Sequence, residues 1–274
     1  MRAIWNRAAS NDHGCDADNL TTALDDSLKN LTTILLTCPP RTVTMNYQGK
    51  RAIIYTDAYF KLGERGVKIG QARDIKDWQV SEVSENGWDF IVIPDQSRPD
   101  IGFSLYGVVP PAIVKLFSGT KAFICFLEAL ADIIAPMILR KLLPEHYVSF
   151  VDNEAAKFAL IKGYGKQKRV NQLIATFWNF NAANTLSPWI ERVPCGANWA
   201  DSVSRNDFSL STQKGWLRLQ PRLNRIWPIL RKIATDSEFA HGESQSILAT
   251  ALRDSVQMQL QARGYLKHCN KSGP

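Results

Sequence analysis

Four acidic residues stand at positions from which their carboxylates could meet in one site. Asp57 and Asp152 each follow a short apolar run, Arg-Ala-Ile-Ile-Tyr-Thr and Val-Ser-Phe-Val. Glu128 lies inside an apolar, helix-like segment, and Asp201 ends the sequence Asn-Trp-Ala-Asp just after a predicted strand. Carboxylates that meet would repel one another unless divalent cations cancelled the like charges. The four residues therefore predict a two-metal site of the kind that cleaves phosphodiester bonds.

Each acid also has a plain structural explanation. Asp57 could simply begin a turn, Asp152 could cap the following helix, and Asp201 could be an ordinary surface acid. Glu128 is harder to explain in this way, because a glutamate among apolar neighbours is seldom buried without a partner. Asp132 lies one helical turn further along the same face. We favour Glu128 of the two because it is more central in the apolar segment.

The spacing of apolar residues predicts an α/β fold that would bring these acids together. Strands are predicted at 52–56, 89–93, 102–106, 147–151 and 189–193, with an insertion or irregular hairpin at about 61–87. Helices are predicted at 20–36, 110–118, 121–142, 153–162, 170–181 and 198–205. Three adjacent strands followed by alternating strands and helices imply a mixed five-stranded sheet, in which three antiparallel strands are followed by parallel ones.

Charge is distributed unevenly along the 274 residues. The net charge is +7, and from residue 211 onward there are ten Lys/Arg against four Asp/Glu. We expect a helical N-terminal segment at 1–46, then an α/β domain at 47–210 and a basic helical C-terminal extension at 211–274. The basic end suits a protein that holds a polyanion. A merely solvated terminus explains it equally well.

Cysteine usage and the chain's N-terminus bear on the compartment. The five cysteines are scattered and contain no Cys-x-x-Cys pair, which argues against a zinc site or a disulfide framework. The first residues lack the apolar core of a signal peptide. The apolar stretch 122–139 contains two acids and a proline, which disfavours insertion into a membrane. We therefore expect an intracellular protein, nuclear or cytoplasmic, that is not secreted.

The four acidic segments, in this order, resemble the ribonuclease H domain found downstream of reverse transcriptase in retrotransposon polyproteins. The matching segments are Tyr55-Thr-Asp57-Ala, Glu128-Ala-Leu-Ala131, Phe150-Val-Asp152-Asn-Glu-Ala-Ala156, and Val193-Pro followed by Asn198-x-Ala-Asp201 and Ser204-Arg205. The resemblance covers residues 48–207, and its last two segments are the most specific. One departure is the loop 194–198, which reads Pro-Cys-Gly-Ala-Asn and lacks the histidine that many members carry there.

The resemblance implies an RNase H-like fold, with the terminal parts as helical extensions, and a site for two Mg²⁺ ions that Mn²⁺ could replace. Asp57 would bridge the ions, Glu128 and Asp152 would support one of them, and Asp201 the other. The implied reaction is hydrolysis of the RNA strand of an RNA–DNA hybrid within a retroelement, with a reverse transcriptase domain as a partner. With this resemblance, the segment 1–46 would suit the end of an upstream polymerase region. The alternative is a non-catalytic RNase H-like module that binds nucleic acid or connects to a reverse transcriptase.

Contacts to nucleic acid are expected from two groups of polar residues. The first group lies within the matching segments and comprises Asn153, Asn198 and Arg205. The second group forms a basic turn between two predicted helices and comprises Lys166, Lys168 and Arg169. Cations of this kind could meet phosphates or 2′-hydroxyls, although an ordinary solvated loop between helices would have the same composition.

Overall fold

The computed structural model describes residues 22–37, 48–61, 85–118, 123–165 and 167–266. Lys166 and most of the stretch predicted at 61–87 lie outside the described residues. Among the helices of the described ranges, none is long and apolar enough to cross a membrane.

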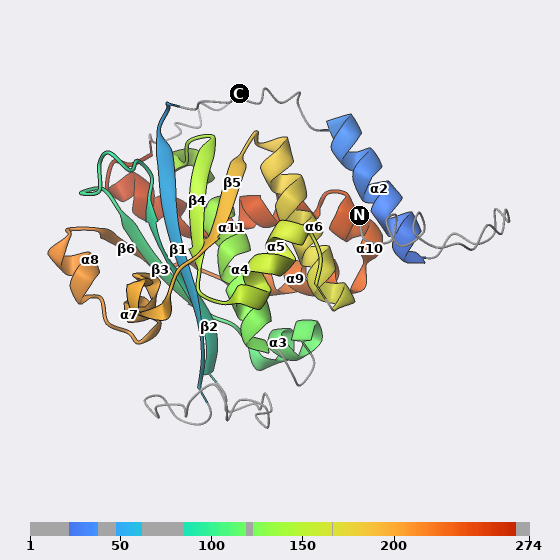
Figure 1. Ribbon diagram of the computed structural model, residues 1–274, viewed down its shortest axis with the longest axis horizontal. Helices are drawn as coiled ribbons and strands as arrows, with labels where there is room; N and C mark the ends of the chain where they lie inside the picture. Colours follow the sequence, from blue (N-terminus) through green and yellow to red (C-terminus); the bar gives the residue numbers. More distant parts are fainter. Residues whose placement is uncertain (1–21, 38–47, 62–84, 119–122, 166, 267–274) are drawn as a thin grey trace, which may run out of the picture.

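Six strands form one mixed sheet (Figure 1). They are β1 (Arg51–Lys61), β2 (Glu85–Ile93), β3 (Phe103–Val108), β4 (His146–Val151), β5 (Ser187–Arg192) and β6 (Leu217–Leu219). Their order across the sheet is β5-β4-β1-β2-β3-β6. β1, β2 and β3 pair antiparallel, whereas β4 is parallel to β1 and β5 is parallel to β4. The predicted mixed α/β architecture is confirmed.

The sheet differs from the prediction in the number of its strands and in the length of β1. β6 pairs parallel with β3 and makes a sixth strand where five were predicted. Its three residues are too few to show an alternating pattern, so only pairing defines it. β1 does not end before Asp57 but continues to Lys61, because Ala58 and Phe60 keep the alternation of core-facing residues. The idea that Asp57 begins a turn is therefore wrong.

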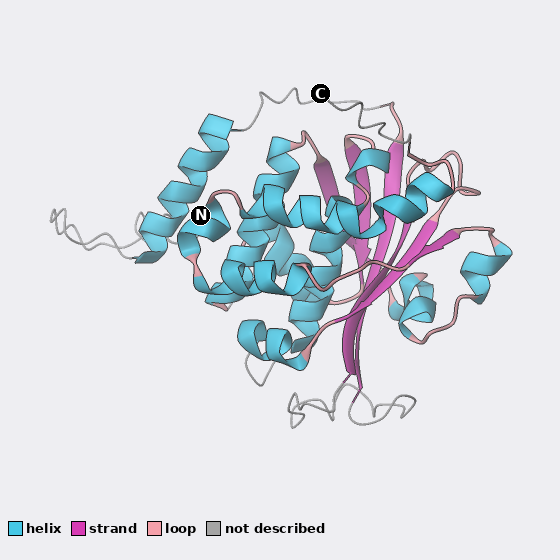
Figure 2. Ribbon diagram, turned by 180° about the vertical axis from the view of Figure 1, so that it is seen from behind, coloured by secondary structure: helices cyan, strands magenta, loops and turns pink. Residues whose placement is uncertain are grey.

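Helices cover the two faces of the sheet unequally (Figures 1 and 2). The larger layer contains α3 (Pro111–Ser118), α4 (Phe123–Ile138), α5 (Glu154–Lys162), α6 (Lys168–Ala183), α9 (Ile226–Thr235), α10 (Ser237–His241) and α11 (Ser244–Ala262), and α2 (Thr22–Thr37) packs on α6 and α10. The opposite face carries α7 (Ala200–Ser204) and α8 (Ser209–Gln213). Two short 3₁₀ turns, η3 (Arg140–Leu142) and η4 (Cys195–Ala197), complete the described elements.

Two apolar clusters hold these layers together. The larger one lies between the sheet and α4, where alternate residues such as Ile54 and Phe90 are wholly buried. α9 and α11 join the same cluster through Leu230 and Leu252, although both helices come from the basic segment after residue 211. The smaller cluster lies under α7 on the other face of the sheet and contains Ile91, Ile93, Val203 and Trp216. Among the apolar residues of β1 and β2, the odd-numbered ones therefore face α7 and the even-numbered ones face α4.

Gly107 of β3 shows how closely the sheet packs on the large layer. A Cβ atom there would lie 2.4 Å from the ring of Trp88 and 2.7 Å from Leu223. Trp88 is wholly buried and cannot move aside. We expect Gly107→Ala to lower the free energy of unfolding by about 1–3 kcal/mol, the usual cost of overpacking a core.

Urea unfolding of Gly107→Ala tests this close approach. Gly196→Ala is the matched control, because a Cβ at Gly196 meets nothing within 4 Å. An unchanged urea midpoint for Gly107→Ala would mean that the contact between Gly107 and Trp88 does not constrain the sheet.

Candidate metal centre

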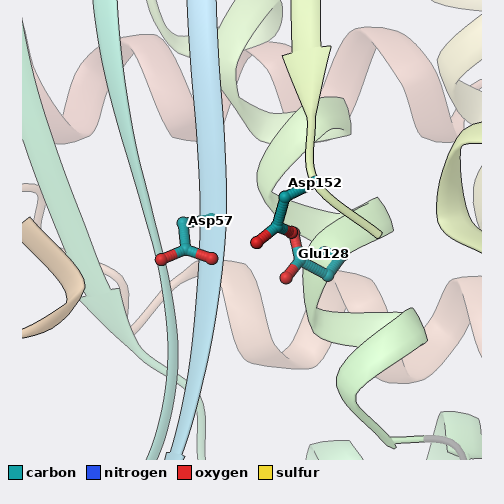
Figure 3. Close-up of side chains that lie close together, drawn as sticks. All are labelled: Asp57, Glu128 and Asp152. Atoms are coloured by element: carbon teal, nitrogen blue, oxygen red, sulfur yellow. The ribbon is translucent and has the colours of Figure 1, made fainter. Parts of the chain in front are cut away.

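Three carboxylates converge where β4 ends (Figure 3). Asp57 projects from β1, Glu128 from α4 and Asp152 from the residue after β4, and one oxygen of each lies within 4.8 Å of the others. The register of the parallel pair explains how two of them meet. Tyr55 is the partner of Phe150. Asp57 and Asp152 are each two residues beyond this pair, Asp57 within β1 and Asp152 just after the end of β4.

Glu128 reaches this group from α4, which packs on the face of the sheet that carries the larger helical layer. It is 3 % exposed, and one of its oxygens has no hydrogen-bond partner. Asp132, one turn further along α4, accepts a hydrogen bond from the Ser149 hydroxyl instead and is not part of the group. Of the two acids on this helix, the one chosen from the sequence is therefore the one that faces the other carboxylates.

Burial and mutual repulsion disfavour the charged forms of these acids. The pKa of Asp57 is raised to about 7 by burial and then by the charge of Asp152, although hydrogen bonds from Ser204 and from the Ala58 backbone oppose the rise. The pKa of Glu128 is raised well above its usual range by burial, and the charges of Asp57 and Asp152 add to the effect. A cation bound between the carboxylates would remove this repulsion. The donors are all oxygens, which suit a hard divalent cation.

Asp201 does not join this group of three. Nη2 of Arg205, one turn further along α7, lies 2.8 Å from both of its oxygens. Four carboxylates were expected to lie together at one point. Three of them do so, and Asp201 is not in the group. Asp201 is still close enough for its charge to raise the pKa of Asp57. The i,i+4 spacing of this acid and arginine is the signal in the sequence that could have revealed the ion pair.

Asn198 attaches the segment that carries Asp201 to the site. Its Nδ2 donates to the carbonyl of Thr56 at 2.8 Å, and its Oδ1 accepts from the backbone N–H of Ala200 at 3.2 Å. Asn198 is 5 % exposed, and both ends of its amide are therefore engaged within the protein. These bonds fix the start of α7 against β1, directly beside Asp57.

The other predicted nucleic-acid contacts lie at varied places. Asn153, not Asp152, caps α5, and its side chain accepts from the Ala156 N–H at 3.0 Å. Lys168 is exposed at the start of α6. Arg169, also exposed, donates to the carbonyl of Leu116 at 2.7 Å and so links α6 to α3. Because Asn153 caps α5, the Asp152 carboxylate is left available to the group of three.

Sequence reasoning missed a fifth acid near this site, Asp89 of β2. Asp89 is the direct partner of Asp57 in the antiparallel pair. It is completely buried, and neither of its carboxylate oxygens has a hydrogen-bond partner in the protein. Burial, and then the charge of Asp57, raises its pKa well above the usual range. The signal was present in the sequence, because Asp89 is the only charged residue in the otherwise apolar run 88–93.

Cys195 occupies the loop in which no histidine was found. It is exposed in η4, and its thiol lies within hydrogen-bonding range of the Asp152 carboxylate. Partial burial, followed by the charge of Asp152, raises the pKa of the thiol. The neutral thiol therefore dominates near pH 7.

A groove opens beside the carboxylates along η4 and α7. Its volume is about 320 Å³, and its lining includes Cys195, Asn198, Trp199, Asp201 and Arg205. The Trp199 ring stacks on Tyr55 with 5.1 Å between centroids, and the residue keeps 36 % of its surface exposed. The groove thus combines the aromatic face of Trp199, the Arg205 guanidinium and the Asp201 carboxylate.

The sequence and the structure were compared with protein families, curated proteins and solved structures. No protein-family model matches the sequence, and no curated protein matches it. Among solved structures, the chain is similar to the N-terminal RNase H domain of Rv2228c from Mycobacterium tuberculosis, solved as a fusion with maltose-binding protein. The TM-score is 0.35 with 14% sequence identity, and the match covers 61% of this chain and 99% of that one. A match at this TM-score adds no argument of its own to the sheet order and the carboxylate geometry.

Proposed function

We propose that this chain hydrolyses the RNA strand of RNA–DNA hybrids with two divalent cations, as the ribonuclease H part of a retroelement. The observation that carries the proposal is the meeting of Asp57, Glu128 and Asp152 within 4.8 Å. They come from a central strand, the helix behind it and the end of the neighbouring parallel strand, in the order that the ribonuclease H resemblance implies. The retroelement origin, an intracellular location and a reverse transcriptase partner belong to the same proposal and rest on the sequence alone.

The carboxylates would act by binding the cations, and they would have to release their protons to do so. Asp57, Glu128 and Asp152 would hold one Mg²⁺, and Asp57 with Asp201 the other. When bound, such a pair of ions activates the attacking water and stabilises the leaving oxygen. Asp57 would have to give up its proton before it could hold a cation, because a protonated carboxyl is a poor ligand. Asn198 holds the start of α7 against β1 through the carbonyl of Thr56, and this would keep Asp201 on the same side as Asp57.

Substrate contacts are proposed along the groove and at the basic turn. Arg205 could exchange its bond to Asp201 for a phosphate once a cation occupies that carboxylate. Trp199 offers an exposed aromatic face on which a sugar or a base could rest. Lys166, Lys168 and Arg169 would contact phosphates further along the duplex. We expect the affinity for a hybrid to fall steeply as salt is raised, since phosphate contacts release counterions.

A cleavage assay tests the proposal directly. An RNA–DNA hybrid labelled on the RNA strand is incubated with the full chain in Mg²⁺, in Mn²⁺ and in EDTA, beside double-stranded DNA, double-stranded RNA and single-stranded RNA. Cleavage of the hybrid RNA alone, abolished by EDTA, supports the proposal. Equal cleavage in EDTA, or no cleavage of the hybrid in either metal, contradicts it.

One observation favours a second candidate, a non-catalytic module that only binds nucleic acid. The fourth carboxylate, Asp201, is already neutralised by Arg205, and the loop that carries Cys195 has no histidine. Salt-sensitive binding of a hybrid without any cleavage in Mg²⁺ or Mn²⁺ would select this alternative.

Alkylation of Cys195 gives an independent test that the groove serves the reaction. A carbamidomethyl group on this thiol would stand beside Asp152 and displace whatever that carboxylate holds. We expect iodoacetamide, applied near pH 9 because the thiol pKa is raised, to lower hybrid cleavage by about tenfold or more. A displacement of about 1 Å at a reacting centre can already cost ~100-fold.

Cys195→Ala is the control for this alkylation. The variant should cleave the hybrid normally and should resist the reagent, although Cys125 and the other cysteines remain in it. Equal inhibition of the wild type and Cys195→Ala would place the sensitive thiol elsewhere.

A further inference from the structure

Two carboxylates stand directly opposite each other in the centre of the sheet. Asp57 and Asp89 are partners in the antiparallel pair of β1 and β2, so their side chains leave the same face of the sheet. Directly opposite residues on one face have Cβ atoms about 4.5–5.5 Å apart, and like charges there are destabilising. Asp89 is 0 % exposed and Asp57 5 %. Water therefore does little to screen one charge from the other.

The surroundings of Asp89 offer it nothing that would compensate a charge. Neither of its oxygens has a hydrogen-bond partner, and no ion pair involves it among the described residues. Ile91 of β2 and Val203 of α7, both in the smaller apolar cluster, lie on the same side of the sheet. A buried carboxylate left in this way is costly unless a proton or a cation joins it. The side chain leaves the sheet on the same face as Asp57, its partner in the antiparallel pair.

We propose that Asp89 is a fifth carboxylate of the metal centre and holds the second cation together with Asp57 and Asp201. This inference rests on the proposed function, and it assigns a ligand that the ribonuclease H resemblance does not supply. Glu128 and Asp152 approach Asp57 from α4 and β4, whereas Asp89 and Asp201 approach it from β2 and α7. Asp57 thus stands between two pairs of carboxylates, one for each ion.

This arrangement also explains why Asp201 lies outside the group of three. A ligand for a second ion has to stand on the far side of Asp57 from Glu128 and Asp152. Burial is the main cause of the raised pKa of Asp89, and the charges of Asp57, Asp201 and Asp152 follow, so Asp89 lies within electrostatic range of all three carboxylates. A cation there would satisfy both orphaned oxygens of Asp89 and release Arg205 from Asp201 for a phosphate.

The number of bound Mn²⁺ ions, measured by calorimetry and by electron paramagnetic resonance on the full chain without nucleic acid, tests the inference. The wild type should bind two ions. Asp89→Asn should keep the first and weaken the second by about tenfold or more, the range seen when groups around a metal are removed. Asp132→Asn is the matched control, because Asp132 is equally buried but accepts its hydrogen bond from Ser149, and this variant should still bind two.

The outcomes separate failure of the inference from failure of the proposed function. Two ions bound by Asp89→Asn with wild-type affinity would overturn the role of Asp89 and leave the metal centre standing. No Mn²⁺ bound by the wild type would contradict the metal centre as a whole. If Asp89→Asn does not fold, wild-type crystals soaked in Mn²⁺ decide the question. An anomalous peak within coordination distance of an Asp89 oxygen, about 2.1 Å for Mg²⁺-like ions, supports the inference, and a peak only among Asp57, Glu128 and Asp152 overturns it.

Discussion

Replacing Asp57 by asparagine is expected to lower Mg²⁺-dependent cleavage of an RNA–DNA hybrid by more than about 100-fold, because even groups that only support metal ligands contribute 10- to 100-fold. Asparagine keeps the size of the side chain but loses the charge and one ligating oxygen. Asp152→Asn should have a similar effect, since Asp152 faces Asp57 within the same 4.8 Å group. Initial rates on a labelled hybrid at saturating Mg²⁺ measure both variants.

The stability of the same variants separates a catalytic loss from misfolding. In EDTA at pH 8, the buried Asp57 of the wild type is negatively charged, because its pKa lies near 7. It is then repelled by the neighbouring carboxylates of Asp152 and Asp201. Asp57→Asn removes that repulsion, so its melting temperature in EDTA should equal or exceed that of the wild type. Asp132→Asn should keep its cleavage activity, since Asp132 bonds to Ser149 away from the group. A variant that folds normally and still cleaves at the wild-type rate would exclude Asp57 from the reaction.

The strands of the central sheet were predictable from the sequence because they are short apolar runs. In β2, Phe90 and Val92 face α4 while Ile91 and Ile93 face α7, and both faces are buried. An apolar run of this kind is typical of a central strand covered on both sides. The element types followed from these patterns, whereas the end of β1 did not, because the polar Asp57 interrupts an alternation that Ala58 and Phe60 resume.

The candidate site was predictable only in part, because its geometry depends on strand register. Asp152 could be placed at the end of a parallel strand, and Glu128 on the buried face of a helix. The pairing of Asp57 with Asp89 could not be deduced, since it depends on which residues of β1 and β2 stand opposite each other. The intervening segment 62–84 is long enough to allow several registers.

Packing also joins parts of the chain that the sequence suggested were separate. The basic segment after residue 211 was interpreted as a helical extension from its charge. It supplies β6 to the edge of the sheet and Leu230 and Leu252 to the larger cluster. Lys and Arg on the exposed faces of these helices determine the charge count, whereas the buried leucines determine where the helices lie. The composition of this segment therefore indicates its charge and not where its helices lie.

The metal-free protein is expected to lose stability as the pH rises from about 4 to about 7. Asp57 has a pKa of about 7 in the folded chain against 3.8 for an unperturbed aspartate, and Asp132 is raised to about 7 as well. Between these pH values the folded state holds protons that the unfolded state has released, so unfolding is favoured as the pH increases. Each pKa unit corresponds to 1.36 kcal/mol, so Asp57 alone accounts for roughly 4 kcal/mol once the pH exceeds 7.

Divalent cations should reverse this trend, because they bind the deprotonated carboxylates. We expect the gain in melting temperature on adding Mg²⁺ to be small at pH 5, where the ion must displace protons, and to become large at pH 8. Asp132→Asn should flatten the pH dependence in EDTA and leave the Mg²⁺ gain unchanged, since Asp132 is outside the group. Asp57→Asn should flatten both the pH dependence of stability in EDTA and the pH dependence of the Mg²⁺ gain. Thermal unfolding in EDTA and in Mg²⁺ at each pH measures these quantities, and an equal Mg²⁺ gain at pH 5 and pH 8 would show that the ion does not compete with protons at these acids.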